Sequence, residues 1–226
     1  MIVLSQLADA NSADLSGVSV AVDVAQILGF PSYPIAADSD PVAVIPAQAE
    51  VISGIWMAPP PSLDRYSTVY EAALAKNIRL LNTPAQHALA QSFDGAAAKL
   101  QGLLPAAALT WEAVRKQAKL RHSQMDPDGL PLGRIFRVLL YRQTILTYGY
   151  FWEADDPLKW LTVQDEEEIA AIALAAAQRL EVAFLAIDTA QQTDETWTIT
   201  GIHDAQFAGT PQIPWLHFWY ELEQLQ

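Results

Sequence analysis

The stretch Phe184-Leu185-Ala186-Ile187-Asp188-Thr189-Ala190 and its continuation Trp197-Thr198-Ile199-Thr200-Gly201-Ile202-His203-Asp204 decide the fold of this chain. Both segments are rich in aromatic and β-branched residues, and a polar loop over residues 191–195 separates them. This pattern predicts two antiparallel strands joined as a hairpin. A loop centred near residue 194 sets Asp188 opposite Gly201, so we expect Asp188, Gly201 and His203 on one face.

Asp188 lies in the middle of an otherwise apolar strand, where aspartate is disfavoured. One explanation is a ligand site on the hairpin. The other is local: Asp188 accepts backbone N–H bonds, and Asp204 does the same in the turn that follows the second strand. The residues alone give the two explanations equal weight.

The net charge and composition of the chain limit the kinds of partner that it can have. The 226 residues include 13 basic and 26 acidic side chains, and the formal charge of −13 argues against nucleic acid as the main partner. A small anionic ligand such as a nucleotide stays compatible with this charge if it meets a local basic pocket. With no cysteine, no basic and apolar leader and no apolar run of membrane-spanning length, we expect a cytoplasmic protein without membrane insertion.

The first half of the chain alternates strand and helix patterns. We predict helices over residues 18–28 and 63–77 and strands over 32–36, 51–57 and 78–81, which together favour a parallel sheet. Thr83-Pro84-Ala85-Gln86 is typical of a helix start, with Thr83 as the N-cap and Gln86 completing a capping box. We expect that helix to run from residue 84 to about 93.

The second half of the chain has a different pattern of predicted helices and strands. A helix is expected over residues 110–122, a hairpin over 134–140 and 144–152 that turns near Arg142-Gln143, and a helix over 165–181 capped by Asp165 and Glu168. The predicted fold class is therefore α/β (α+β), with an N-terminal α/β lobe and linking helix over residues 1–105. Residues 106–226 form a second lobe of antiparallel sheet and helices, and the whole is expected to be one compact unit.

Arg134 and Arg137 are the second group of candidates, because Arg137 should face the same side of its strand as Ile135 and Leu139. A buried arginine needs an anionic partner, which is either a phosphate or one of the protein's own carboxylates. Charge balance favours the internal ion pair about two to one. The familiar short nucleotide, hydrolase and zinc motifs are absent from the sequence.

The order of these segments resembles the ATP-grasp superfamily. Three stretches carry the resemblance: Asn77-Ile78-Arg79-Leu80-Leu81-Asn82-Thr83-Pro84 with Phe93-Asp94, the hairpin from Arg134 to Trp152, and the segment from Phe184 through Gly201-Ile202-His203-Asp204-Ala205-Gln206. The resemblance implies two lobes that clasp ATP and Mg²⁺ and an enzyme that activates a carboxylate as an acyl phosphate. It places Asp188 and Asp204, with His203, on the metal, and Arg134, Arg137 and Gln206 on the nucleotide.

Two departures from the pattern bear on activity. Gly201 stands where the resemblance calls for a glutamate, and the strand that should carry an ATP-binding lysine has no counterpart in the helix expected over residues 110–122. Two functions follow: an ATP- and Mg²⁺-dependent ligase or phosphotransferase acting on a small carboxylate, or a catalytically inactive relative that binds a small molecule or protein or serves in assembly. The aromatic segment Trp215 to Tyr220 could supply a hydrophobic contact in an assembly.

Overall fold

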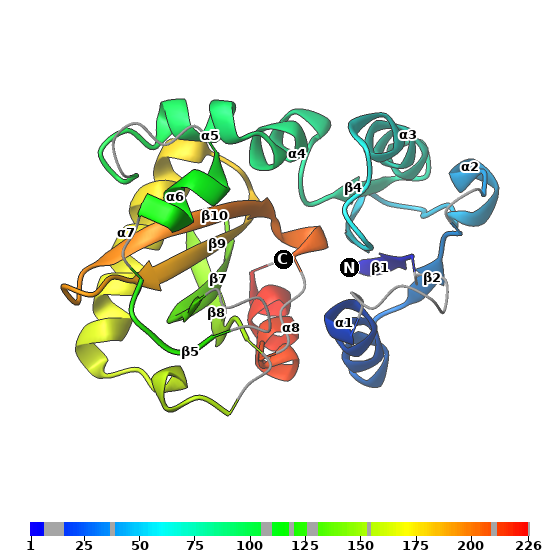
Figure 1. Ribbon diagram of the computed structural model, residues 1–226. Helices are drawn as coiled ribbons and strands as arrows, with labels where there is room; N and C mark the ends of the chain where they lie inside the picture. Colours follow the sequence, from blue (N-terminus) through cyan, green and yellow to red (C-terminus); the bar gives the residue numbers. More distant parts are fainter. Residues whose placement is uncertain are drawn as a thin grey trace.

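The computed structural model describes residues 1–6, 16–36, 39–104, 110–117, 120–125, 131–152, 155–208 and 212–225. Two four-stranded sheets lie side by side, one built from the first part of the chain and one from the last (Figure 1). The expected lobe boundary at residues 105 and 106 falls outside the described residues. No helix of the described part is long and apolar enough to cross a membrane.

The first sheet is parallel, as the alternating pattern predicted. Its strand order is β2-β1-β3-β4, formed by β1 (Ile2–Ser5), β2 (Ser32–Pro34), β3 (Ile52–Met57) and β4 (Ile78–Leu80). β1, which was not predicted, lies between β2 and β3. Its four residues are all buried, as expected for a strand covered by helices on both faces.

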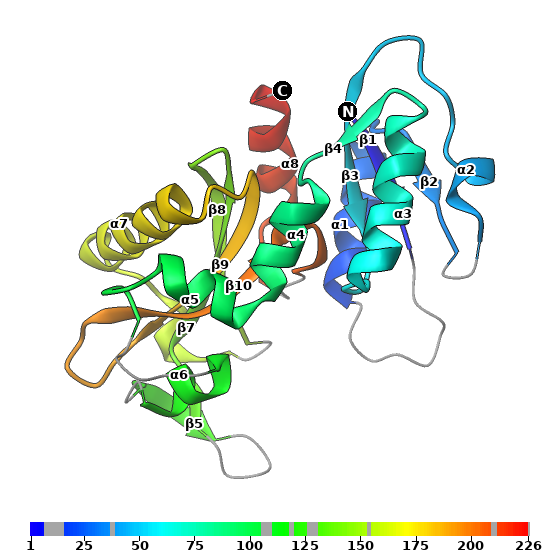
Figure 2. The same cartoon turned by 90° about the horizontal axis from the view of Figure 1, so that it is seen from above.

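Helices cover both faces of this sheet (Figure 2). On one face α1 (Ser16–Ile27) packs in the core cluster that contains Val3, Ile55 and Met57. On the other face α3 (Leu63–Leu74) packs against the alternate side chains of the strands, with the short α2 (Pro41–Val44) beside it. The predicted helices over residues 18–28 and 63–77 are confirmed within a few residues at their ends.

The linking region is helical at first. α4 (Pro84–Gln91) begins with the capping box of Thr83 and Gln86 that the sequence predicted, and α5 (Phe93–Lys99) follows it after Ser92. The helix expected over residues 110–122 is shorter, because α6 spans Trp111–Gln117. β5 (His122–Met125) pairs instead with β6 (Pro131–Gly133), so the end of that prediction was wrong.

The second sheet is antiparallel in the order β10-β9-β7-β8. Its strands are β7 (Ile135–Tyr141), β8 (Thr144–Tyr150), β9 (Phe184–Gln191) and β10 (Trp197–Asp204). Both predicted hairpins are confirmed. The first turns at Arg142 and Gln143, whose φ angles of 46° and 65° supply the left-handed conformation of a tight hairpin turn without glycine. In the second, Asp188 lies opposite Gly201, as expected.

Each face of the second sheet has its own cover. α7 (Val163–Leu180) packs on one face, and α8 (Trp215–Gln224) packs on the other and against α1 (Figure 2). The capping box of α7 is formed by Thr162 and Asp165, one turn before the predicted pair of Asp165 and Glu168. The short 3-10 helices η1 (Pro157–Lys159) and η2 (Ala205–Phe207) lead into α7 and away from β10.

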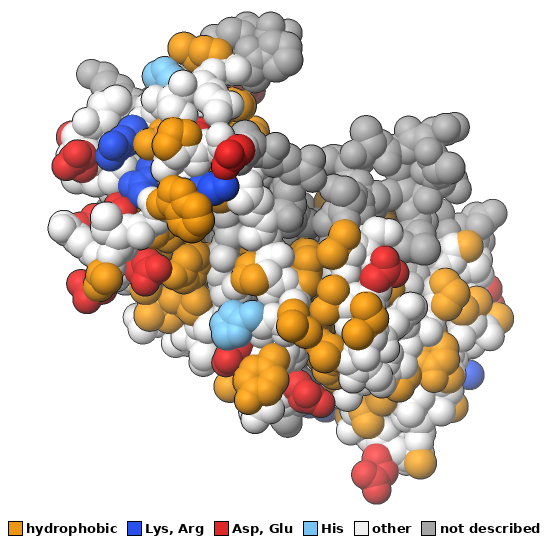
Figure 3. Space-filling view, turned by 90° about the horizontal axis from the view of Figure 1, so that it is seen from below, with side chains coloured by type: hydrophobic (Ala, Val, Ile, Leu, Met, Phe, Trp, Pro, Cys, Tyr) orange, Lys and Arg blue, Asp and Glu red, His pale blue; other side chains and the backbone are white. Residues whose placement is uncertain are grey.

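The aromatic residues of α8 belong mainly to the core. Trp215, Phe218 and Trp219 are buried in the cluster that joins α1 to the second sheet, and Trp219 Nε1 donates to the carbonyl of Ala21. Leu216 and Tyr220 are the large hydrophobic side chains that this helix exposes. On the face of the molecule seen from below, hydrophobic side chains are separated by polar and charged ones (Figure 3).

Candidate functional site

The strand carboxylate Asp188 is held by an arginine on the neighbouring strand. β7 and β9 pair so that Arg137 lies opposite Asp188. Arg137 Nε donates to Asp188 Oδ1 at 2.7 Å and Arg137 Nη2 donates to Oδ2 at 2.9 Å, which is a bidentate ion pair. Both residues are buried, with 6% and 5% of their surface exposed. Arg137 therefore has a carboxylate of the protein as its partner, as charge balance favoured, and this carboxylate lies on the neighbouring strand.

His203 completes this cluster. Its Nε2 lies 3.0 Å from Asp188 Oδ2, and the side chain is about one third exposed. Burial alone would raise the pKa of Asp188, but the attraction of Arg137 and His203 and their hydrogen bonds lower this pKa well below its usual range. Asp188 is therefore an ionised carboxylate with both oxygens engaged. The guanidinium also lies over the ring of Phe151, 5.0 Å from its centroid.

Gly201 is the position that lets this cluster form. A Cβ atom built on Gly201 would lie 2.7 Å from Asp188 Oδ2 and 3.0 Å from His203 Nε2. Any larger side chain would have to displace one of those groups. The packing around position 201 thus agrees with a glycine rather than a glutamate there, because Asp188 and His203 occupy the space that a side chain would need.

Asp204 lies on the opposite face of the sheet from Asp188 and His203. Successive side chains of a strand point to opposite faces, and residues 203 and 204 are consecutive in β10. Asp204 Oδ2 lies 3.0 Å from Nδ1 of His87 on α4, and Oδ1 accepts from the backbone N–H of Gln206 at 3.0 Å. Asp204 is completely buried.

Gln206 belongs to a hydrogen-bond network between the two sheets. Its Oε1 accepts from the backbone N–H of Trp56 on β3, and its Nε2 donates to the hydroxyl of Tyr66 on α3 at 2.9 Å. Tyr66 in turn donates to the carbonyl of Asn82 at 2.7 Å, and the Asn82 side chain exchanges two hydrogen bonds with the backbone of Phe184. Gln206 is completely buried, so its side-chain amide stabilises the contact between the two sheets.

Arg134 is fully engaged within the protein. Its guanidinium donates to both oxygens of Asp165, to Gln191 Oε1 at 2.7 Å and to the carbonyls of Leu158 and Trp160. Burial alone would raise the pKa of Asp165, but the hydrogen bonds from Arg134 and Thr162 lower it to about 2. Arg134 therefore anchors η1 and the start of α7 on the sheet.

The structure brings together only part of the predicted site. Asp188, His203 and Arg137 form one cluster, while Asp204 and Gln206 lie in the network between the sheets and Arg134 lies at the start of α7. The expectation that Asp188, Asp204 and His203 would converge on a metal is not met, because β10 sends residues 203 and 204 to opposite faces. Within the described ranges, no group of three or more His, Asp or Glu side chains could hold a metal ion.

Three further residues complete these arrangements and were not among the predicted site residues. Asn82, Tyr66 and His87 contact Phe184, Gln206 and Asp204, from which they are separated by more than 100 positions. A separation of this size leaves no periodic signal in the sequence. The one available signal was the Asn82-Thr83-Pro84 motif, which located Asn82 but did not show its partner.

Comparisons with known proteins show which fold the chain has. The sequence matches no family model and no curated protein. Similar solved structures include D-alanine–D-alanine ligase from Bacillus anthracis complexed with ATP, at 8% identity and a TM-score of 0.58, with 99% of this chain and 97% of that chain covered. The ATP-grasp ligase PsnB complexed with a minimal precursor matches at 10% identity and a TM-score of 0.55, with 99% of both chains covered.

D-cycloserine synthetase DcsG is a third such structure, at 12% identity and a TM-score of 0.54, and 99% of this chain and 100% of that chain are covered. These likenesses extend over the whole architecture of two sheets and their helices. The identities are too low to carry residue roles from one chain to another. The chain therefore has the ATP-grasp fold and is a divergent example of it.

Proposed function

We propose that this chain is a binding protein built on the ATP-grasp fold, and that its β9–β10 hairpin does not perform Mg²⁺-dependent ligation. The observation that carries the proposal is the Arg137–Asp188–His203 cluster, in which both carboxylate oxygens of Asp188 have internal partners. The expected lobes, residues 1–105 and 106–226, are then a scaffold joined by the Asp204–Gln206 network.

The residues of the hairpin do not fit Mg²⁺. This ion prefers octahedral oxygen ligands and usually takes one or two carboxylates that are free to turn toward it. Asp188 would have to exchange its two hydrogen bonds with the buried Arg137 for the ion, and breaking a buried ion pair is costly. Asp204 faces the other side of the sheet and already accepts from Gln206 and contacts His87. The remaining oxygen ligand suggested by the resemblance is replaced by Gly201.

The predicted phosphate contacts fit no better. All the hydrogen-bonding directions of Arg134 are used by Asp165, Gln191 and two backbone carbonyls. Gln206 is buried with both ends of its amide engaged. A nucleotide phosphate at either residue would have to break contacts that hold the second sheet to its surroundings.

The partner we propose is a peptide or a small molecule. One of the similar solved structures, macrocyclase MdnC from Microcystis aeruginosa MRC, is described as bound with precursor peptide MdnA, at a TM-score of 0.51, and PsnB is described as complexed with a minimal precursor. The ligase alternative, an enzyme that uses ATP and Mg²⁺ to activate a small carboxylate, is supported by the fold shared with these ligases. It requires the Arg137–Asp188 pair to open.

Titration calorimetry with MgATP separates the two functions. We expect no saturable heat at millimolar nucleotide for the wild-type protein, and no ATP turnover. The variants to compare are Asp188→Asn and, as the matched control, Asp155→Asn, whose side chain is 94% exposed. Binding and turnover of MgATP that Asp188→Asn abolishes and Asp155→Asn preserves would overturn the proposal in favour of the ligase alternative. Binding that both variants preserve, without ATP turnover, would leave the hairpin without a role in it, as proposed, and would identify the nucleotide as the bound small molecule.

A further inference from the structure

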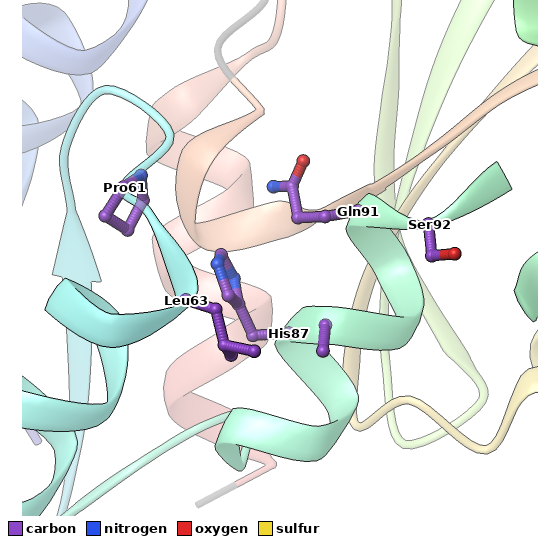
Figure 4. Close-up of a pocket in the computed structure, with 6 residues that line it drawn as sticks. Pro61, Leu63, His87, Gln91 and Ser92 are labelled. Carbon is purple, nitrogen blue, oxygen red and sulfur yellow. The ribbon is translucent and has the colours of Figure 1, made fainter.

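A pocket of about 270 Å³ opens between the loop that follows β3 and helix α4 (Figure 4). Pro61 and Leu63 line it on one side, and His87, Ala88, Gln91 and Ser92 line it on the other. Its volume lies just below the range of roughly 300–1,000 Å³ that is common for ligand pockets. The pocket therefore suits a small compound or a single side chain of a peptide.

His87 is the buried polar group of this pocket. Only 1% of the residue is exposed, and the ring stacks on Tyr66 with a centroid distance of 4.2 Å and an interplanar angle of 13°. The edge of the Phe207 ring contacts it from a second direction, with a centroid distance of 5.3 Å. These contacts fix the plane of the imidazole and leave it no freedom to turn.

The hydrogen bond to Asp204 fixes the proton of His87. Asp204 Oδ1 already accepts from the Gln206 backbone, and Oδ2 lies 3.0 Å from His87 Nδ1. A carboxylate oxygen requires a donor at this distance, so the geometry assigns the proton to Nδ1. In the neutral ring Nε2 then carries the lone pair, and it has no hydrogen-bond partner among the described residues.

We propose that the pocket is a binding site for a small ligand with a hydrogen-bond donor, a hydroxyl or a protonated amine on a short apolar body. His87 Nε2 accepts the hydrogen bond, Asp204 holds the ring in the accepting tautomer, and Pro61, Leu63 and Ala88 contact the apolar part. A carboxylate of the same size brings no proton for Nε2, and no Lys or Arg is among the described residues that line the pocket, so we expect the donor ligands to bind in preference to it.

This site is independent of the Arg137–Asp188–His203 cluster. Asp204 and Asp188 face opposite sides of the second sheet, and the pocket lies on the α4 side with Asp204. Binding in the pocket therefore does not depend on whether the hairpin performs ligation. It adds a ligand class to a part of the fold that the sequence resemblance left without a role.

The test uses three probes that share one carbon chain: 1-butanol, n-butylamine and butyrate. Binding is followed by NMR through the imidazole resonances of His87 and by the affinity obtained from the titration. We expect saturable shifts of the His87 ring with the alcohol and the amine and none with butyrate. Saturable binding of butyrate, or no shift of His87 with any probe, would overturn the proposal.

Two variants locate the binding. His87→Asn keeps a donor toward Asp204 and removes Nε2, and Leu63→Trp fills the mouth of the pocket without touching the Asp204 network. Each should weaken binding at least about tenfold, the change expected when one hydrogen bond or the apolar contact is lost. Leu74→Trp is the matched control, because Leu63 and Leu74 on α3 are both 46% exposed and only Leu63 lines the pocket. Unchanged binding in a folded Leu63→Trp protein, or equal loss in Leu74→Trp, would refute the assigned site.

Discussion

Replacing Asp188 by asparagine tests whether the Arg137–Asp188 pair is a structural element of the sheet. The change keeps the shape of the side chain and removes its charge, so the buried Arg137 loses its anion. Breaking a buried pair by removal of one partner costs about 3–5 kcal/mol. We expect the lower end, about 3 kcal/mol, because the asparagine oxygen still accepts one hydrogen bond from the guanidinium.

Urea unfolding followed by tryptophan fluorescence and circular dichroism measures this loss. With a slope of about 2–3 kcal/mol per molar urea, the midpoint should fall by about 1–1.5 M. Asp155→Asn, which breaks the exposed pair of Asp155 with Lys159, should leave the midpoint unchanged within error. The double variant Arg137→Met with Asp188→Leu should recover most of the lost stability, since apolar replacement of a whole buried pair is often neutral.

A loss of less than about 1 kcal/mol in Asp188→Asn would refute a structural role of the pair, because the pair would then contribute too little to keep Asp188 from other partners. A double variant less stable than the single one would refute it as well. A wild-type protein whose unfolding midpoint rises with added Mg²⁺, while that of Asp188→Asn does not, would show that the carboxylate is available to the ion after all.

The remaining predictions concern the neighbouring groups. Gly201→Ala should destabilise the protein by about 1–3 kcal/mol in thermal unfolding, because the new Cβ would meet Asp188 and His203 at 2.7 and 3.0 Å, and an unchanged melting temperature would contradict this packing. The pKa of Asp165 is lowered to about 2, so its contribution is complete above about pH 4 and is lost as the pH falls toward 2. Asp165→Asn should therefore flatten the acid side of the stability profile, and an unaltered profile would count against the Arg134 contact. Asn82→Ala should cost about 2–4 kcal/mol, since it leaves two buried backbone groups of Phe184 without partners, and a urea midpoint equal to that of the wild type would exclude this role.

Local sequence patterns predicted most of the helices and strands, and particular residues show why. Asp188 lies opposite Gly201 as a loop centred near residue 194 predicted, but the strands reach this pairing through a register shift between Ile199 and Gly201 that the sequence pattern did not indicate. Arg142 and Gln143 turn the other hairpin without a glycine or asparagine, yet the patterns on either side located the turn. β1 was missed because its four residues are bounded by no turn signal that distinguishes them from a loop.

The site was less predictable, because its partners come from distant parts of the chain. Strand alternation already separates residue 203 from residue 204, and the expected metal set joined them only through the resemblance. That Asp204 would meet His87 depends on how α4 packs against β10, and that Gln206 would meet Tyr66 depends on how the first sheet and α3 lie against η2. Such contacts are set by the tertiary packing, and no spacing within one segment encodes them.

The residues that made the family resemblance visible are largely those that join the two sheets. Asn82 bonds to Phe184, and Asp204 and Gln206 connect α4, β3 and α3 to the end of β10. A chain that keeps this architecture must keep these groups buried and paired, whatever chemistry it performs. Gly201 belongs to a different environment, in which Arg137 and His203 close around Asp188. The sequence could therefore resemble the family at the residues that connect the two sheets. It departs from the family around Asp188, where ligation would need a carboxylate that is free to bind a metal ion. For the same reason, the resemblance was reliable for architecture and gave no test of activity.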